Sequence, residues 1–170
     1  MKPKKIFIPD NGRYPGNSLP VLVYKSALKL PRLFPAKYIK KLFQKNGWTR
    51  NWKDGIYTYD HYHSNTHEVL GVSKGKSTIR FGGEKGPEIT LEKGDVVVIP
   101  AGVAHKNLGR KNDLTCVGGY PEGKYPDSNY GEKGERPKAD YKIASLSLPK
   151  CDPVFGENKG LVRIWKDITE

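Results

Sequence analysis

Short runs of apolar residues, each bounded by Gly, Pro or charged residues, recur along most of the chain and predict β-strands. We expect strands over residues 6–8, 21–24, 56–63, 69–72, 77–81, 88–91, 96–99, 106–108, 114–117 and 161–165. Several short strands at roughly 8–12-residue spacing, separated by turns, are typical of an antiparallel sandwich or barrel. They argue against alternating strands and helices. The pattern therefore predicts an all-β fold.

One stretch in the first third of the chain has helical spacing instead. Within residues 35–46, Ile39, Leu42 and Phe43 fall on one helical face and the lysines fall elsewhere, and Gly47 suits the end of a helix. The sequence predicts a short N-terminal amphipathic helix that packs on the sheet. A helix lying on a membrane surface is the alternative interpretation.

The segment 121–138 is rich in Gly, Pro and charged residues and predicts a long loop. Loops of this length in compact domains are usually mobile or functional. Two interpretations stay open, a lid over a pocket or a flexible connection across the surface. A second short helix is predicted over residues 139–148, before Pro149.

Length and composition place limits on the molecule as a whole. A chain of 170 residues with 36% hydrophobic residues suits one ordinary domain, so we expect a single domain over residues 1–170. Cys116 and Cys151 form no CxxC pair and are expected to be reduced, with Cys116 a small core residue. The sequence shows neither a secretory leader nor a membrane span, so we expect a cytoplasmic protein.

The net charge of +12 changes the expected partners only slightly. The lysines and arginines are scattered along the chain, without an arginine-rich block. This distribution favours solubility or attraction of anionic small molecules over dedicated binding of nucleic acid.

Histidines and a glutamate are the side chains best placed for chemistry. In a strand, His61 and His63 share one face, with backbones roughly 6.6 Å apart. Glu68 opens the next apolar run, which could pair antiparallel with the first and bring a carboxylate alongside. His105 follows a buried strand and a Pro/Gly turn. His61 and His63 are close enough to converge on one ion, with Glu68 alongside, and His105 offers one more histidine.

Two stretches, residues 55–75 and 94–105, resemble the two sequence motifs of the cupin superfamily. The first motif is matched by Gly55, His61, His63, Glu68 and Gly75, and the second by Gly94, Pro100, Gly102 and His105. The second motif ends on Leu108 where the family has Asn, a position that is not a metal ligand in the family. The flanking sequence resembles small single-domain bacterial cupins of the YjlB type over nearly the whole chain.

The resemblance implies a jelly-roll β-barrel, or double-stranded β-helix, with a motif core at about residues 55–120 and terminal extensions packing on the barrel. It also implies that His61, His63, Glu68 and His105 bind a divalent transition metal: Fe, Mn, Ni, Zn or Cu. The family's spacing also permits His67 in place of Glu68. We expect Glu68 to be the ligand and His67 to lie behind the ligands or at the rim. Cupins commonly pair through edge strands, which implies a homodimer.

Three further residues are candidates for lining the pocket: Tyr57, Tyr59 and Arg80. The alternative for each is a structural role, as core aromatic residues and an exposed arginine. Two functions are compatible with the resemblance. The first is a metal-dependent enzyme, of the dioxygenase or isomerase class, acting on a small molecule. The second is a non-catalytic cupin that binds a small-molecule ligand.

Overall fold

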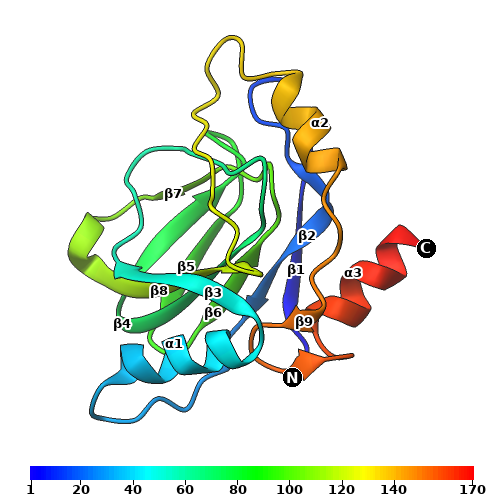
Figure 1. Ribbon diagram of the computed structural model, residues 1–170. Coiled ribbons are helices and arrows are strands. Elements are labelled where there is room, and N and C mark those ends of the chain that lie inside the picture. Colours follow the sequence, from blue (N-terminus) through cyan, green and yellow to red (C-terminus); the bar gives the residue numbers. More distant parts are fainter.

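An antiparallel β-sheet dominates the computed structural model, which describes all 170 residues. Its strands are neighbours in the order β1-β2-β6-β4-β8-β3, and β5 and β7 also pair with β4 (Figure 1). The strands are β1 (Lys4–Ile8), β2 (Asn17–Tyr24), β3 (Trp48–Asp54), β4 (Glu68–Phe81), β5 (Glu88–Glu92), β6 (Val96–Ile99), β7 (His105–Asn107) and β8 (Leu114–Pro121). Two short strands, β9 (Cys151–Asp152) and β10 (Gly156–Glu157), form a separate hairpin.

The long strand β4 makes the sheet close on itself. The first part of β4 pairs with β6 and β8, and its second part pairs with β5 and β7. Because the two parts have different neighbours, the sheet wraps around an interior instead of continuing as a flat layer. This arrangement fits the expected jelly-roll β-barrel.

The core lies in two layers, one on each side of the sheet. Along β6, Val97 and Ile99 join the cluster inside the barrel, whereas Val96 and Val98 join a second cluster beneath the helices. Both faces of the strand are therefore buried. This explains why β6 is a continuous apolar run without the alternation of a half-exposed strand.

Three helices and one short 3₁₀ turn complete the fold: α1 (Pro35–Lys45), α2 (Lys138–Ala144), α3 (Leu161–Thr169) and the turn Lys111–Asp113. Helix α1 packs on the sheet through Ile39 and Phe43, as its spacing predicts. It follows two strands and begins at residue 35, so its description as an N-terminal helix is not confirmed. None of the helices combines the length and hydrophobicity needed to cross a bilayer.

Two predicted strands are corrected by the structure. Residues 161–165 form the first part of helix α3. Its apolar residues Leu161 and Trp165 pack in the cluster beneath the helices. The same apolar positions are compatible with a strand, but they also have helical spacing, and the helix forms. Residues 56–63 form an irregular segment. The backbone of that segment bonds only to single residues of other segments, such as His61 to His105 and Tyr62 to Asn129. The expected pairing of this segment with β4 does not form, and β4 pairs with β5, β6, β7 and β8.

Candidate metal centre

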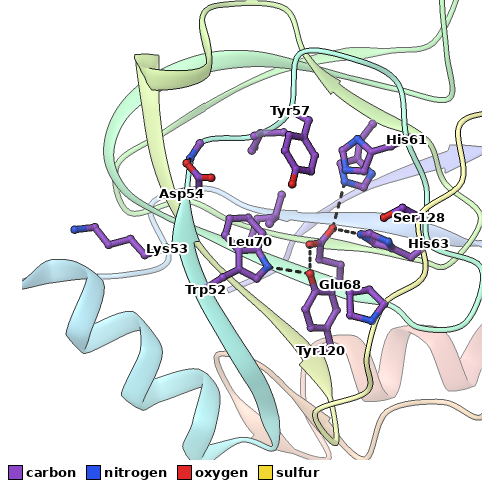
Figure 2. A pocket seen from close by; sticks show the side chains of 14 residues that line it. Trp52, Lys53, Asp54, Tyr57, His61, His63, Glu68, Leu70, Tyr120 and Ser128 are labelled. Atoms are coloured by element: carbon purple, nitrogen blue, oxygen red, sulfur yellow. Dashed lines mark hydrogen bonds and ion pairs between the residues drawn. The ribbon is translucent and has the colours of Figure 1, made fainter.

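Four polar side chains meet inside the barrel, close to its mouth. His61 and His63 come from the irregular segment after β3, Glu68 opens β4 and His105 opens β7. One ring nitrogen from each of the three imidazoles lies within 4.8 Å of those of the other two. Glu68 Oε2 lies 3.3 Å from His63 Nε2 and 3.2 Å from His105 Nε2. Figure 2 shows the Glu68 carboxylate pointing into the space between His61 and His63. The structure thus brings together all four residues expected to be ligands.

Each imidazole is oriented by a main-chain carbonyl. Nδ1 lies 3.1 Å from the Tyr59 carbonyl in His61 and 3.1 Å from the Val103 carbonyl in His105. In His63, Nδ1 bonds to the carbonyl of Asp127. A carbonyl can only accept, so each Nδ1 carries the proton and each Nε2 has a free lone pair. The backbone therefore fixes the tautomer that binds metals through Nε2.

The centre is a cluster of acceptors without a donor between them. All four side chains are buried, and Glu68 Oε2 has no hydrogen-bond donor. Lone pairs that face a buried carboxylate repel it unless a cation lies between them. Three imidazoles and one carboxylate are also ligands that divalent transition metals accept. The residues therefore fit a divalent metal.

The pKa values of these groups follow from the same crowding. Burial, reinforced by neighbouring His105, lowers the pKa of His61 to about 3, so this imidazole is neutral at physiological pH. Burial opposes the ionisation of Glu68, but His63 and His105 outweigh it and lower the pKa of the carboxyl group. Burial likewise opposes protonation of His63, yet Glu68 raises its pKa above the ordinary value. A proton therefore competes with a metal for His63 Nε2.

A short chain of hydrogen bonds orients the other oxygen of Glu68. The Tyr120 hydroxyl donates to Glu68 Oε1 over 3.1 Å, and Trp52 Nε1 donates to the Tyr120 hydroxyl over 2.9 Å (Figure 2). Burial and the Glu68 charge raise the pKa of Tyr120, so its hydroxyl remains a donor. Gly118 makes room for the indole, since a Cβ atom there would lie 2.1 Å from Trp52.

Tyr120→Phe is expected to weaken metal binding by about 10–100-fold, the usual effect of losing a group that supports a ligand. The ring stays in place, so the fold is retained, but Glu68 loses the donor to Oε1. Competition with a chromogenic chelator measures the affinity. Tyr141→Phe is the matched control, because Tyr141 lies exposed on α2. Equal affinities of the two variants would contradict the role of Tyr120.

The predicted loop 121–138 proves to be an ordered part of the site. Besides the Asp127 carbonyl that holds His63, the Asp127 carboxylate accepts bonds from Ser64 N at 2.7 Å and Ser64 Oγ at 2.5 Å. Lys142 Nζ of α2 donates to it over 2.9 Å. Burial opposes ionisation of Asp127, but Ser64 and Lys142 outweigh it and lower its pKa. Asp127 supports the candidate site through these contacts, and the sequence reasoning missed it because no local pattern marks it.

Asp127→Ala is expected to reduce metal affinity roughly ten-fold. The carbonyl that holds His63 is part of the backbone and remains, but the bonds to Ser64 and Lys142 that fix its position are lost. The same chelator competition measures the change. Asp140→Ala serves as the control. It removes an acidic residue of α2 that is paired with Arg136, just before the helix. An unchanged affinity in Asp127→Ala would show that the loop holds its position without this carboxylate.

The remaining candidate residues divide between the pocket and other places. His67 does not join the ligand group: it lies on the other face of the sheet, where its ring packs against Trp165 of α3. Adjacent residues of a strand point to opposite faces, so Glu68 and His67 cannot both reach the metal. Burial and the charge of Lys124 lower the pKa of His67 to about 4. Arg80 is paired with Asp60 at 2.9 Å and does not line the pocket.

The pocket above the four side chains has a volume of about 320 Å³. Its walls combine aromatic side chains with a few polar groups, and Tyr57, Trp52 and Tyr120 are the aromatic residues. Tyr59 does not line the pocket itself but stacks on Tyr57 with ring centres 4.9 Å apart, and both rings are partly exposed at the mouth. A pocket of this kind suits a small molecule with a flat face.

Known proteins support the same fold. Residues 52–116 match the family model of the cupin domain. The chain is 42% identical over 160 residues to the protein YjlB of Bacillus subtilis (strain 168), and the alignment covers 94% of both chains. Cys116, expected in the core, is fully buried within this matched region.

Two solved structures illustrate the more distant similarities. Acireductone dioxygenase from Bacillus anthracis, with a cadmium ion in its active centre, is 18% identical, and the match covers 63% of this chain and 82% of that one with a TM-score of 0.44. A cupin-like protein from Thermotoga maritima is 22% identical, with coverage of 71% and 84% and a TM-score of 0.39. With YjlB matched over nearly its full length, the chain belongs to the YjlB-type group of the cupin superfamily.

Proposed function

We propose that this cupin is a metal-dependent enzyme, of the dioxygenase or isomerase class, that acts on a small molecule. The observation that carries the proposal is the buried group of acceptors formed by His61, His63, Glu68 and His105. The reaction class follows from the chemistry that this set of ligands gives a bound metal. A divalent transition metal bound by these residues supplies Lewis-acid polarisation of a substrate oxygen or, with iron or copper, redox chemistry with dioxygen.

The residues around the centre define what the pocket accepts. Tyr57 and Trp52 offer flat apolar surfaces, and the exposed hydroxyl of Ser128 is free to bond to a polar substituent. Lys53 belongs to the wall of the pocket and makes no ion pair, but its ammonium group points away from the four acceptors (Figure 2). Neighbouring Asp54 is paired with Lys111 at 2.8 Å. The net charge of +12 favours an anionic molecule. We propose a small, flat, anionic substrate that fits about 320 Å³.

The protein also holds the reacting region in a restricted environment. His61 and His105 are almost completely buried, and Tyr120 closes the pocket behind Glu68. A water-poor pocket strengthens the electrostatic effect of every fixed charge and dipole inside it. The Tyr120 hydroxyl keeps its proton and holds Glu68 in one orientation. The terminal segments pack on the barrel, and we propose that the chain works as one domain.

Turnover of defined mixtures tests this function. Protein loaded separately with Fe, Mn, Ni, Zn or Cu is incubated with keto acids, sugar acids and aromatic acids, under air and under argon, and products are followed by mass spectrometry. A dioxygenase converts its substrate only under air, and an isomerase converts it under both gases. The His61→Ala variant is expected to be inactive but folded. Ligand binding without any product would contradict the enzyme and support the non-catalytic alternative.

A further inference from the structure

His67 carries a buried nitrogen that has no hydrogen-bond partner in the protein. Its Nδ1 accepts a bond from Ala101 N at 3.0 Å. In a neutral imidazole the other nitrogen then carries the proton. Nε2 is thus an N–H donor directed away from Ala101, and it is buried without a partner in a side chain that is only 4% exposed. A buried donor without an acceptor is destabilising, so a ligand that accepts from it gains a hydrogen bond that the protein does not satisfy.

Two hollows on this face of the sheet meet at His67. One has a volume of about 170 Å³ and the other about 530 Å³, and both are lined by His67, Leu146 and Leu148. The smaller hollow also contains Trp48, Thr66 and Lys124 in its walls. It shares no residue with the pocket of the metal centre. His67 therefore borders a separate space on the opposite side of β4.

The wall of the smaller hollow includes a weakly held segment. The main chain of Ser147–Lys150 lies outside the helices and strands and makes no backbone hydrogen bond. Segments with few such bonds open locally at low cost in free energy. Opening of Ser147–Lys150 would let a ligand in the hollow reach His67 Nε2, which is buried while this wall is closed.

The charges at this hollow favour an anion. Lys150 is paired with Glu122 at 3.4 Å, whereas Lys124 is exposed and makes no ion pair. Lys124 and the His67 N–H are thus one free cation and one free donor at the same hollow. Two donors match the two oxygens of a carboxylate, while Leu146 and Leu148 supply an apolar surface for a short alkyl chain.

We infer that this hollow is a second ligand site, which binds a short-chain carboxylate between His67 Nε2 and Lys124. Size limits the chain length. A water molecule occupies about 30 Å³ in the liquid, so the hollow of about 170 Å³ holds an acid of only a few carbon atoms. The site does not depend on the metal centre.

Propionate is the probe, and propionamide, which has the same shape without the charge, is its control. Titrations of protein with ¹⁵N-labelled histidine are followed by NMR, which observes both nitrogens of His67. Propionate is expected to saturate and to shift His67 Nε2, with propionamide binding roughly ten-fold more weakly, because a charged hydrogen bond is lost.

Two variants test the contacts and a third separates this site from the metal centre. His67→Asn keeps an acceptor for Ala101 N, but its side chain is too short to place an N–H at the position of Nε2. Lys124→Gln removes a charge from an exposed residue. Each is expected to weaken propionate binding roughly ten-fold. His105→Ala, studied without metal, is expected to bind propionate as the wild type does.

Three results would overturn the inference. The first is the absence of saturable binding, which would leave the donor to water or to the Trp165 ring. The second is an unchanged affinity in both His67→Asn and Lys124→Gln. The third is the loss of propionate binding in His105→Ala, which would place the probe in the metal pocket. Lys124→Gln changes only an exposed side chain, so it remains informative even if His67→Asn fails to fold.

Discussion

His105→Ala is expected to abolish stoichiometric metal binding while the chain stays folded. His105 lies at the middle of the cluster, with its ring centre 4.2 Å from that of His61 and its Nε2 3.2 Å from Glu68 Oε2. Removing it leaves three of the four acceptors and opens the centre to water. The loss of affinity is expected to exceed the roughly 10–100-fold that follows from losing a supporting group. Element-resolved mass spectrometry of untagged protein, purified without chelator, measures the metal content per chain.

His67→Asn is the matched control for this experiment. It also changes a buried histidine, and the residue lies next to Glu68 but faces away from the centre. Wild type and control are expected to carry close to one metal per chain. If the wild type contains no metal, and added Fe, Mn, Ni or Zn raises neither occupancy nor melting temperature, the centre is not a metal site.

Asp152→Ala is expected to lower the free energy of unfolding by about 3–5 kcal/mol. Asp152 is fully buried and accepts bonds from the Tyr24 hydroxyl at 2.5 Å and from Leu161 N at 2.8 Å. It also accepts from Val154 N at 2.8 Å and Phe155 N at 2.9 Å. Alanine leaves all four donors without this acceptor, and two of them, the Tyr24 hydroxyl and the Leu161 N–H that starts α3, belong to buried bonds. Urea denaturation measures the change.

An exposed acidic residue of helix α3, Asp167, provides the comparison. Asp167→Ala removes a carboxylate that makes no ion pair, and surface changes of this kind usually stay within about 0.5 kcal/mol. A loss below about 1 kcal/mol in Asp152→Ala would mean that water or a shifted backbone replaces the acceptor. The C-terminal helix would then be attached mainly by the apolar contacts of Leu161 and Trp165.

Local spacing predicted an antiparallel sandwich or barrel, and the resemblance to cupins narrowed it to a jelly roll with a four-residue site. Continuous apolar runs such as 96–99 specify strands buried on both faces. The convergence of His61 and His63 was also predicted, although the strand assumed for them does not form. The two side chains meet because the segment stays extended across the barrel mouth, where its backbone bonds to His105 and Asn129. The two side chains were expected to converge on the basis of an incorrect local structure.

Other features were beyond reach because they depend on contacts distant in the sequence. Asp127 supports His63 from 64 residues away, and the Gly- and Pro-rich sequence around it gives no sign of this contact. Residues 161–165 are apolar at positions that suit a strand or a helix. The helix is favoured by Asp152, which accepts from the first helical N–H, and by the core that receives Trp165. The sequence of residues 161–165 alone predicts neither the bond to Asp152 nor the packing of Trp165.

The three imidazoles take their orientation from main-chain carbonyls, at Tyr59, Val103 and Asp127. A carbonyl is present whatever side chain the residue carries. Evolution can therefore exchange these three side chains without deleting the acceptor, provided that the chain keeps its path. The path of the backbone, and not the side chains at these three positions, therefore sets the tautomer of the three imidazoles. Distant relatives with the same centre are better recognised by the route of their loops than by the residues along them.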